Sequence, residues 1–596
     1  MIIKIDLAKN TVYPEDQYTR REVSKLFTRE KIFTRDLSEI KIIETDFLRR
    51  FYVSIPRPLE RISIVLVEEP NQVFRKIGED EEYEIYSMNR ETIIVGRKLV
   101  CYGENSVGPY IVSEKILSRI YAIDNELVLE ADPGSMNYSR DALCEARFIV
   151  LPREAPTQLL DRDIVSSMLS RLSKGYYEDG LIWALVRSGF VPRSELPDYI
   201  IDGQAYYWPR GDLLRRYLYM WYFDEIPEAL GLYREILQQL IDQLSESGGL
   251  RIPYITAARM RDIYGSPQQL YVFETLARAY DLFRVEELRD KALRALECYT
   301  KQPPECLGFY ETRRGGWWFR WGSYHYLSRD PEKKEDLYVL NTHLMGVVGL
   351  LEGYRYLDCE NCLRHAMRGI EALEELLEEF ARSDGYLFYS LYNKERFGDL
   401  EDVIMPHTIG YHLLSTRLLL RAAYLLDEEA IRKKFMSYGV RGCEYGYRRY
   451  LSGRRDLWRE LVRCFVELYR LTGDEEYIRR IDRVTREVNE DIRATGLFID
   501  ETRHRFLPPL IRSSEEYSIL LLDNDHDEAS YYVYSKNQIM LQVSSKKLLG
   551  RSISEIRDLR IKSLADLDVD RSVDIAQSGD KYILSLKGSI ILTLRF

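Results

Sequence analysis

The stretch LNTHLMGVVGLLEGYRYLDCE, residues 340–360, decides the fold of the central part of the chain. Its large apolar residues recur every three or four positions, at Leu340, Leu344, Val347, Leu351 and Tyr354. That spacing places them on one stripe of an amphipathic α-helix. A short polar turn and an acidic residue follow, and an acidic first turn favours the positive end of a new helix dipole. The stretch therefore predicts a helix, a turn and a second helix.

The same pattern returns in the neighbouring sequence. A helix end with tyrosine, a polar turn and an acidic start occur in YDLFRVEELRDKAL (280–293), YRYLDCENCLRHAM (354–367), YLLDEEAIRKKF (424–435) and YRLTGDEEYIRRI (469–481). Their spacing is too irregular for a strict repeat solenoid. It suits antiparallel helix pairs closed into an (α/α) toroid with long insertions. We assign residues 156–505 to this toroid.

The flanking regions have a strand-like pattern. Within residues 1–155, runs rich in β-branched and aromatic residues are broken by turn residues, at Phe51–Ile55, Ile62–Val67, Glu91–Val95 and Leu127–Ala131. A β-sandwich is the natural packing for such strands. Similar runs follow residue 505, at Tyr517–Leu522, Tyr531–Tyr534, Ile539–Val543, Tyr582–Leu586 and Ser589–Leu594. The predicted fold class is therefore a multidomain α+β protein: a β-sandwich-like domain (1–155), a central (α/α) toroid (156–505) and a small β domain (506–596).

Composition excludes several classes of partner. The chain has 596 residues, a net charge of −11 and a pI of about 5.5. An acidic protein is a poor match for nucleic acid or an anionic membrane, because phosphate neutralisation needs clustered Lys and Arg. The apolar run at the N-terminus is interrupted by Asp6, and the most apolar helical stretch is too short to span a bilayer. We expect a cytoplasmic protein without a transmembrane segment, and a homodimer is compatible with the sequence.

The cysteines give a weak signal for metal or redox chemistry. Cys359 and Cys362 form a CxxC motif, but no second CxxC or HxxxH follows to complete a zinc site. We favour incidental or disulfide-forming cysteines there, and Cys298 and Cys306 are a second candidate pair. Phosphate-binding and dinucleotide-binding glycine motifs are absent from the sequence, so we expect no metal and no cofactor.

The region from Gly248 to Asp427 resembles the catalytic helical domain of D-glucuronyl C5-epimerases. The core of the resemblance is YVLNTHLMGVVGL (338–350), which is similar to the family's VLN-containing helix. Matching motifs occur in the same order at Thr275–Tyr280, Ala292–Leu296, Gly315–Phe319, Arg368–Leu373, Gly385–Leu391 and Tyr411–His412. The resemblance implies a uronate C5-epimerase that acts on a glucuronyl residue of a glycan or glycan precursor.

Such an enzyme removes the C5 proton beside a carboxylate and returns a proton to the other face, so it needs one acid/base group on each side. The resemblance implies that Tyr411 is one of the pair. The other is Tyr324 or Tyr326, between which the sequence does not decide, and the family's acidic pair is missing before them. His325 stands where one of those acids is expected. In another register His407–Thr408 takes the tyrosine position, but the apolar stripe after Tyr411–His412 fits the family's helix better.

Further residues are assigned to the substrate. The arginines near the tryptophan pair, Arg313, Arg314 and Arg320, are candidates for the uronate carboxylate, because a guanidinium binds a carboxylate bidentately. Asn341 is either a hydrogen-bonding partner of the sugar or a helix cap. The remaining predicted substrate contacts are Trp317, Trp318, His325, Tyr389, Tyr392 and His412. We expect one of the two tryptophans to face the core, and His343 to be either a core histidine or a cleft residue.

Two other functions are compatible with the same sequence. A polysaccharide lyase or glycosidase on a related toroid is one of them; a lyase shares the proton abstraction, and a glycosidase needs two facing carboxylates. The other is a non-catalytic glycan-binding protein that has kept the toroid, which the missing acidic pair favours.

Overall fold

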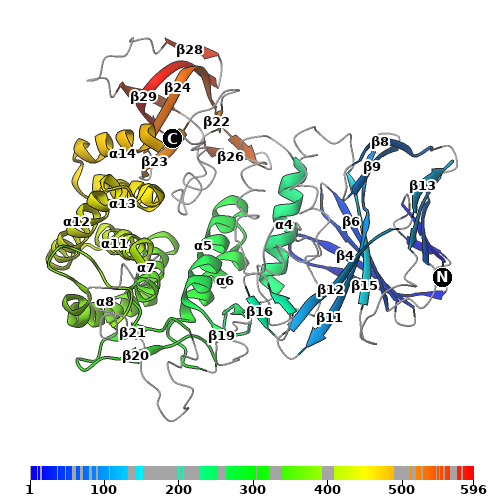
Figure 1. The fold of residues 1–596 in the computed structure, drawn as a ribbon, viewed down its shortest axis with the longest axis horizontal. Coiled ribbons are helices and arrows are strands. Elements are labelled where there is room, and N and C mark those ends of the chain that lie inside the picture. The colour runs from blue at the N-terminus through cyan, green and yellow to red at the C-terminus, as the bar shows by residue number, and fades with distance from the viewer. Residues whose placement is uncertain are drawn as a thin grey trace. The chain divides into compact units, whose positions relative to one another are not determined.

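The computed structural model describes most of residues 2–151 and 510–595, parts of 199–252, residues 263–322 apart from 304, and residues 338–391 and 408–488. By its internal contacts the chain forms two compact units. The first unit comprises residues 1–243 and 252–255, and the second comprises residues 244–251 and 256–596. Figure 1 shows the first in blue to cyan-green and the second in green to red. The boundaries at 155 and 505 stay predictions.

The first unit is built on two β-sheets. The smaller sheet has the order β13 (Arg119–Ile123), β14 (Glu126–Ala131), β7 (Ile62–Val67), β1 (Ile2–Asp6) and β2 (Thr11–Tyr13). The larger sheet begins with β3 (Thr19–Ser24), β4 (Arg29–Arg35), β5 (Ser38–Glu44) and β6 (Arg49–Pro56). It continues with β15 (Leu143–Leu151), β10 (Glu91–Gly96), β9 (Tyr83–Met88) and β8 (Arg75–Glu79). Two more strands, β11 (Lys98–Asn105) and β12 (Gly108–Ile116), pair beside β15. The four strands predicted in this region are present.

Alternate residues of the two sheets form one core. Ile3 and Ile5 of β1 and Ile64 and Leu66 of β7 belong to the same buried cluster as β5, β6, β10 and β15 residues of the larger sheet. This period of two is what a strand shows when one face is buried. The shared core is the packing that the predicted β-sandwich requires.

A helix covers the other face of the larger sheet. The helix α4 (Pro227–Asp242) carries Glu235, whose carboxylate lies 3.1 Å from Arg50 of β6, and both side chains are buried. Gln238 accepts a hydrogen bond from the backbone N–H of Phe27 at 3.0 Å. A short hairpin, β16 (Tyr199–Ile201) with β17 (Gln204–Tyr206), also belongs to this unit. The larger sheet therefore packs against a helix that is distant from it in the sequence.

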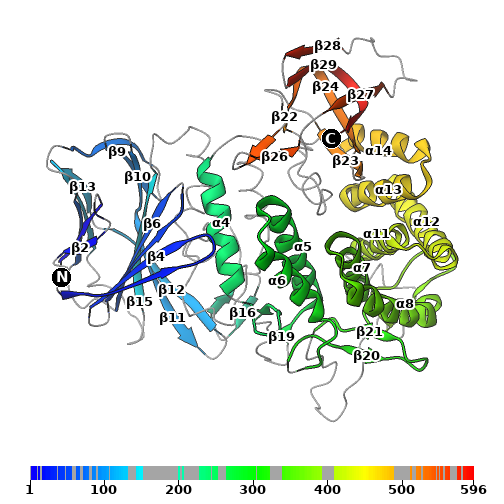
Figure 2. The same ribbon diagram turned by 180° about the vertical axis from the view of Figure 1, so that it is seen from behind.

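Four helix pairs lie in the described part of the second unit. They are α5 (Ser266–Phe283) with α6 (Glu286–Glu297), α7 (Leu340–Leu357) with α8 (Glu360–Phe380), α11 (Thr408–Leu425) with α12 (Glu429–Leu451), and α13 (Trp458–Thr472) with α14 (Glu475–Val488). The first helices of the pairs are successive neighbours in the order α5, α7, α11 and α13, as Figures 1 and 2 show. We call α5, α7, α11 and α13 the inner helices and their partners the outer helices. The four predicted helix–turn–helix patterns are confirmed.

Each of α5, α7 and α11 is preceded by a tight turn of the same form. In each turn a glycine takes a positive φ: Gly248 at 89°, Gly315 at 86° and Gly385 at 101°. Residues with a Cβ rarely adopt this conformation. The turn at Gly315 joins β20 (Phe309–Glu311) to β21 (Trp317–Phe319), and the turns at Gly248 and Gly385 are closed by isolated bridges Leu244–Leu250 and Ala381–Leu387. The second unit therefore repeats a turn, an inner helix and an outer helix.

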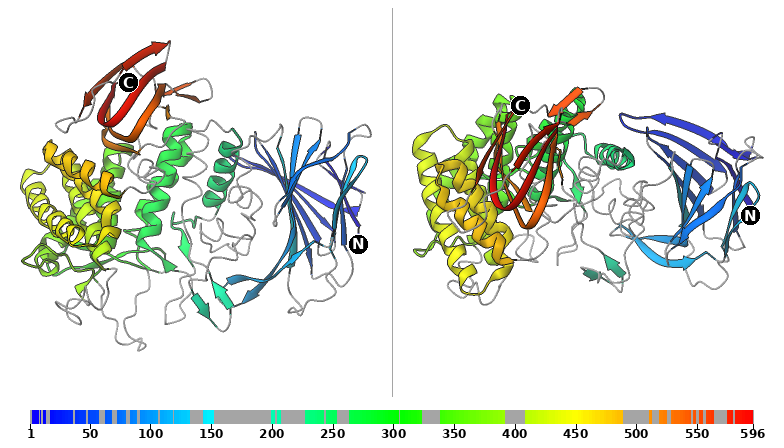
Figure 3. Two further views of the ribbon diagram at one scale, coloured as in Figure 1. Left: turned by 45° about the horizontal axis from the view of Figure 1, so that its top comes forward. Right: turned by 90° about the horizontal axis from the view of Figure 1, so that it is seen from above.

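Four of the strands predicted near the C-terminus are merged into two long strands. Tyr531–Tyr534 and Ile539–Val543 lie on one strand, β24 (Glu528–Ser544), and Tyr582–Leu586 and Ser589–Leu594 lie on one strand, β29 (Lys581–Arg595). The two strands pair along their length with a register shift between Ser535 and Ile539, so the break in the apolar pattern marks a bulge rather than a turn. They form the curved orange and red sheet in Figure 3.

Further strands complete this sheet, and hydrogen bonds join it to the helices. The strands are β22 (Leu510–Arg512), β23 (Ser518–Asn524), β27 (Asp558–Ser563) and β28 (Asp574–Ser578), with a separate hairpin of β25 (Lys546–Leu548) and β26 (Arg551–Ser554). The hydroxyl of Tyr532 donates to Asp482 of α14 at 2.8 Å, and both side chains are buried. In the described residues, no helix has the length and apolar character needed to cross a membrane.

Candidate functional site

The N-terminal ends of three inner helices meet at one end of the helical array. Ser266, the first residue of α5, donates its hydroxyl to the carbonyl of Thr342 in α7 at 2.7 Å. Leu340, the first residue of α7, donates its N–H to the carbonyl of Tyr389 at 3.0 Å, and the Tyr389 ring lies 4.8 Å from the ring of Tyr411 in α11. A chain of direct contacts thus links the starts of α5, α7 and α11.

The inner helices α5, α7 and α11 differ from the outer helices in the charge of their first turns. The first turns of α5, α7 and α11 contain no acidic residue, whereas the outer helices begin with Glu286 and Glu287, Glu360, Glu429, and Glu475 and Glu476. An acidic first turn neutralises the positive end of the helix dipole. Neither α5 nor α7 has a side-chain cap. The unneutralised helix ends therefore converge and favour an anionic group.

Two histidines fix the turns that precede their helices. His343 of α7 accepts a hydrogen bond from the N–H of Phe319 at 3.1 Å through Nδ1, and its Nε2 lies 3.1 Å from the carbonyl of Gly369 in α8. His412 of α11 makes the same pair of bonds, at 2.9 Å to Leu387 N–H and at 3.0 Å to the carbonyl of Gly442 in α12. In each histidine Nδ1 accepts and Nε2 donates.

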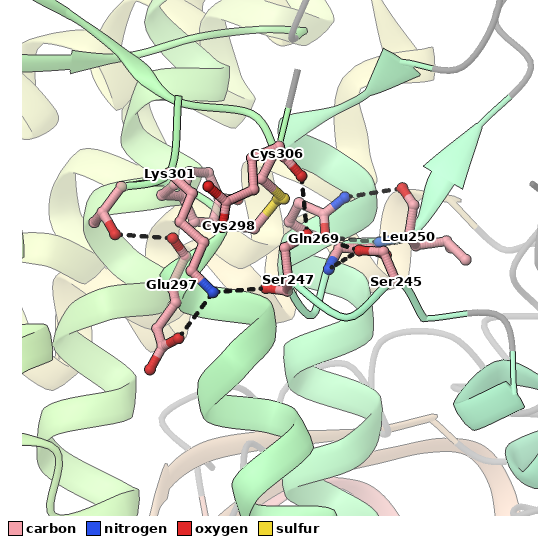
Figure 4. Close-up of a disulfide and its surroundings, with 12 residues drawn as sticks. Ser245, Ser247, Leu250, Gln269, Glu297, Cys298, Lys301 and Cys306 are labelled. Atoms are coloured by element: carbon pink, nitrogen blue, oxygen red, sulfur yellow. Dashed lines mark hydrogen bonds and ion pairs between the residues drawn. A yellow bond between two sulfur atoms is a disulfide. The ribbon is translucent and has the colours of Figure 1, made fainter. Parts of the chain in front are cut away.

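A glutamine takes the corresponding place in α5. The side chain of Gln269 accepts from the N–H of Leu250 at 3.2 Å and donates to its carbonyl at 3.0 Å (Figure 4). Both histidines and this glutamine are fully buried. The core alternative for His343 is confirmed, and burial lowers the pKa of this histidine to about 3.

The sequence did not predict that His343 and His412 hold the turns and helices together through hydrogen bonds to the backbone. His412 was predicted to contact substrate, but its two ring nitrogens are both bonded to backbone groups and its side chain has no exposed surface. The function proposed below therefore includes no contact between His412 and the substrate. One sequence pattern could have predicted this role. A histidine recurs near the start of two inner helices, and the outer helix that follows each of them contains a glycine.

Tyr411 and Asn341 have the surroundings that a binding site needs. Tyr411 lies in the first turn of α11 and is 39% exposed, although most of its helix is buried. Asn341 lies in the first turn of α7 and is 4% exposed, and its Oδ1 is buried without a hydrogen-bond partner among the described residues. A buried amide oxygen without a partner is costly in a folded protein. A hydroxyl donor of a bound sugar would satisfy it.

One tryptophan of the pair faces the core and the other does not, as predicted. Trp318 is fully buried and its ring is stacked between His343, at 4.0 Å, and Phe380, at 5.4 Å. Its predicted stacking on a sugar is wrong, because both partners cover it. Trp317 is partly exposed and stacks on Phe309 at 4.1 Å. Its role in substrate binding stays a prediction.

The predicted carboxylate-binding arginines are spread along the β20–β21 hairpin. Arg313 and Arg314 are exposed in the turn beside Gly315. Arg320 is partly exposed, lies 4.3 Å above the ring of Tyr310 and donates to the carbonyl of Phe309 at 3.4 Å. Arg320 is the one nearer to the inner helix ends along the chain, because Trp321 directly after it accepts the N–H of Ser266 at 3.0 Å.

Four predicted site residues, Tyr324, His325, Tyr326 and Tyr392, lie outside the described residues. The residues that flank them belong to the same end of the array: Gly322 bridges to Gly265 before α5, and Leu391 donates its N–H to Tyr338 before α7. The remaining predicted residue, Tyr389, provides the contact between α7 and Tyr411 that is described above.

Comparisons with known proteins identify the helical segment. Residues 263–438 match the family model described as D-glucuronyl C5-epimerase C-terminus. No match was found among curated proteins. The resemblance from Gly248 to Asp427 inferred from the sequence coincides with most of the matched segment.

The solved structures that match this chain have low identities and low TM-scores. Cellobiose 2-epimerase from Bacillus thermoamylovorans B4167 is 14% identical with a TM-score of 0.32, covering 50% of this chain and 76% of that one. Unsaturated glucuronyl hydrolase from Bacillus sp. GL1 is 13% identical with a TM-score of 0.26, covering 39% and 59%. A family 76 glycoside hydrolase from a bovine Bacteroides thetaiotaomicron strain is 11% identical with a TM-score of 0.35, covering 76% and 91%.

The resemblance inferred from the sequence and the family match agree: residues 263–438 are similar to the D-glucuronyl C5-epimerase C-terminus.

Proposed function

We propose that the helical unit is part of an (α/α) toroid and that the protein is a uronate C5-epimerase acting on a glucuronyl residue in a glycan or glycan precursor. The observation that carries the proposal is the contact chain Asn341–Leu340–Tyr389–Tyr411. It brings a partly exposed tyrosine and a buried unpartnered amide oxygen to the same end of the helical array. The family match supports the class of reaction.

The substrate carboxylate would lie near the unneutralised ends of α5, α7 and α11. Partial positive charge there opposes the charge that builds up when the C5 proton leaves, because the resulting enediolate places more negative charge on the carboxylate. Arg320 is the candidate cation closest along the chain to these ends. Asn341 Oδ1 would accept a hydrogen bond from a sugar hydroxyl.

In the proposed reaction one tyrosine removes the C5 proton and a second tyrosine returns a proton to the opposite face. Tyr411 is one member of this pair. Tyr324 or Tyr326 is the other, in the sequence between Gly322 and Tyr338. The sugar remains attached to its neighbours throughout, since no bond to oxygen breaks.

Exchange of the C5 hydrogen with solvent tests the proposal. The full chain is incubated in deuterated water with glycans that contain glucuronate, and the products are examined by mass spectrometry and NMR. We expect deuterium at C5 without chain cleavage. An unsaturated, ultraviolet-absorbing product would instead indicate a lyase, and no exchange with any glycan of a broad uronate panel would contradict the proposal.

Substitution of Tyr411 tests the assignment of the base. Tyr411→Phe keeps the ring that packs on Tyr389 but removes the hydroxyl, so we expect exchange to fall by about 100-fold or more with little change in glycan binding. The matched control is Tyr424→Phe, which alters the same helix thirteen positions later, where the tyrosine ring lies against Arg421. Equal activity of the Tyr411→Phe variant and the control would remove Tyr411 from the mechanism.

A further inference from the structure

The turn between α7 and α8 contains a disulfide whose two sulfurs differ in environment. Cys359 and Cys362 of the sequence Cys359-Glu-Asn-Cys362 are bonded to each other. Cys359 is the N-cap residue of the 21-residue helix α8, and its sulfur accepts the backbone N–H of Cys362 at 3.2 Å. The CxxC motif is thus an oxidised cysteine pair at the start of a long helix.

Access to the two sulfurs is unequal. Cys362 is 4% exposed, whereas Cys359 is partly exposed at the surface of the turn. A thiolate attacking this disulfide from solvent therefore reaches Cys359 first. The buried Cys362 would then be the leaving group, retained in the protein next to the sulfur that it left.

The disulfide between Cys298 and Cys306 provides an internal contrast. Both of its cysteines are fully buried, after the end of α6. Figure 4 shows this disulfide beside the 245–250 turn, which is held by the bond from Lys301 to the carbonyl of Ser247 and by Gln269. A Cβ on Gly249 would lie 2.6 Å from the sulfur of Cys306, so the turn closes tightly over the bond. Solvent cannot reach either sulfur without local unfolding.

Positive and negative groups both surround Cys359. The N-terminus of α8 directs its dipole and the N–H of Cys362 at the sulfur, and such a position lowers the pKa of a thiol. Arg289, which donates to the carbonyl of Leu357 at 2.7 Å, and Arg364, bonded to Asn361, add positive charge to the same turn. The exposed carboxylates of Asp358 and Glu360 oppose them from the solvent side.

We propose that Cys359–Cys362 is a reversible thiol–disulfide exchange site and that its reaction partner is a dithiol. One thiolate of the dithiol attacks the sulfur of Cys359; a mixed disulfide forms, and the Cys359–Cys362 bond breaks with Cys362 leaving as a thiolate. The second thiol of the dithiol then attacks its own sulfur in the mixed disulfide and releases Cys359. Two electrons pass to the protein, and the dithiol leaves as a disulfide.

Reduction at this site leaves the helices in place. The bond closes a loop of four residues, and short loops remove less entropy from the unfolded chain than long ones. The backbone bond from Cys362 N–H to the carbonyl of Cys359 remains after the sulfurs separate. The reduced state is therefore a folded protein with one reactive thiol at the surface of the α7–α8 turn.

A redox titration of the folded chain tests the proposal. The full chain is equilibrated with reduced and oxidised dithiothreitol in graded ratios, quenched with iodoacetamide, and mapped peptide by peptide by mass spectrometry. We expect Cys359 and Cys362 to become alkylated together in one two-electron transition. Cys298 and Cys306 should stay bonded in the same samples, with unchanged circular dichroism.

Serine variants test the order of attack. Alkylation of Cys359 in Cys362→Ser should be about tenfold or more faster than alkylation of Cys362 in Cys359→Ser, because thiolate character and exposure set the rate. The proposal fails if Cys359–Cys362 resists reduction as fully as Cys298–Cys306 in the folded chain, or if Cys362 reacts faster than Cys359.

Discussion

The two buried histidines show how a single residue type can organise a helical array. His343 and His412 each join the strand before their own helix to the helix after it, through one accepted and one donated hydrogen bond. A neutral imidazole supplies one acceptor and one donor, whereas a protonated one supplies two donors. The bonds to Phe319 N–H and Leu387 N–H therefore require the neutral form.

The neutral form of His343 gives the protein a measurable pH dependence. Its pKa is about 3 in the folded chain, because burial disfavours the charged ring, and about 6.5 when unfolded. The folded chain binds fewer protons between these values, so this stabilisation is complete above pH 6.5 and is lost as the pH falls toward 3. At pH 5 the loss is about 2 kcal/mol relative to pH 8.

Replacement of His343 by glutamine isolates this effect. Gln269 shows that a glutamine side chain can accept and donate to backbone in the corresponding place of α5. We expect His343→Gln to reduce the difference in unfolding free energy between pH 8 and pH 5 by about 2 kcal/mol, measured by urea unfolding. An unchanged pH dependence in the variant would assign the acid sensitivity to other groups.

At the scale of elements, the hairpin of β20 and β21 packs on α8 through a glycine. A Cβ on Gly316 would lie 2.4 Å from the backbone nitrogen of Ala372 and 2.8 Å from its Cα. Helix backbone cannot move aside as a flexible side chain can. The same hairpin positions Trp318 over His343, so the close approach also fixes the ring stack.

Gly316→Ala should therefore destabilise the helical unit by about 1–3 kcal/mol, through overpacking between the hairpin and α8. Gly410→Ala is the matched control: Gly410 lies in the first turn of α11, and nothing lies within 4 Å of the position its Cβ would take. We expect the control to leave the thermal unfolding temperature unchanged or slightly raised, because alanine favours helix. Similar losses in both variants would argue against the packing explanation.

At the scale of the whole molecule, the contact between α4 and the large sheet determines which residues fold together. Glu235 and Arg50 are both buried, and their sequence positions are far apart. Residues 1–243 belong to one compact unit. This unit continues past residue 155, where the sequence changes from a strand-like to a helix-like pattern and a domain boundary was predicted. Breaking a buried ion pair by removing one partner typically costs about 3–5 kcal/mol.

Fragments of the chain test this division. Residues 1–243 should unfold in one cooperative transition, whereas residues 1–155 should be markedly less stable, because Arg50 loses its partner and the sheet face under α4 becomes exposed. Circular dichroism melts and binding of a hydrophobic dye distinguish the two fragments. Equal stability of the two fragments would mean that α4 contributes little to the first unit.

The sequence by itself predicted the order of the helices and the resemblance of their segment to the D-glucuronyl C5-epimerase family. Apolar stripes predict α5, α7, α11 and α13 because an amphipathic helix needs nothing beyond its own period of 3.6. The polar turns with acidic starts located the outer helices for the same local reason. The partner proposed for Tyr411 stays undecided between Tyr324 and Tyr326, because neighbouring tyrosines cannot be distinguished by spacing alone.

Only the tertiary structure decided which polar residues meet. It placed His412 in the core and left Tyr411 partly exposed beside it, although the two residues are adjacent in sequence, because successive helix positions point to different faces. It showed that two predicted strands are parts of one strand, β24. The sequence could not show this, because a bulge and a turn both interrupt the alternation of apolar residues in the same way. It also brought Asn341 and Tyr411 to one end of the array, a proximity set by the packing of α7 on α11 and by no local feature of the sequence.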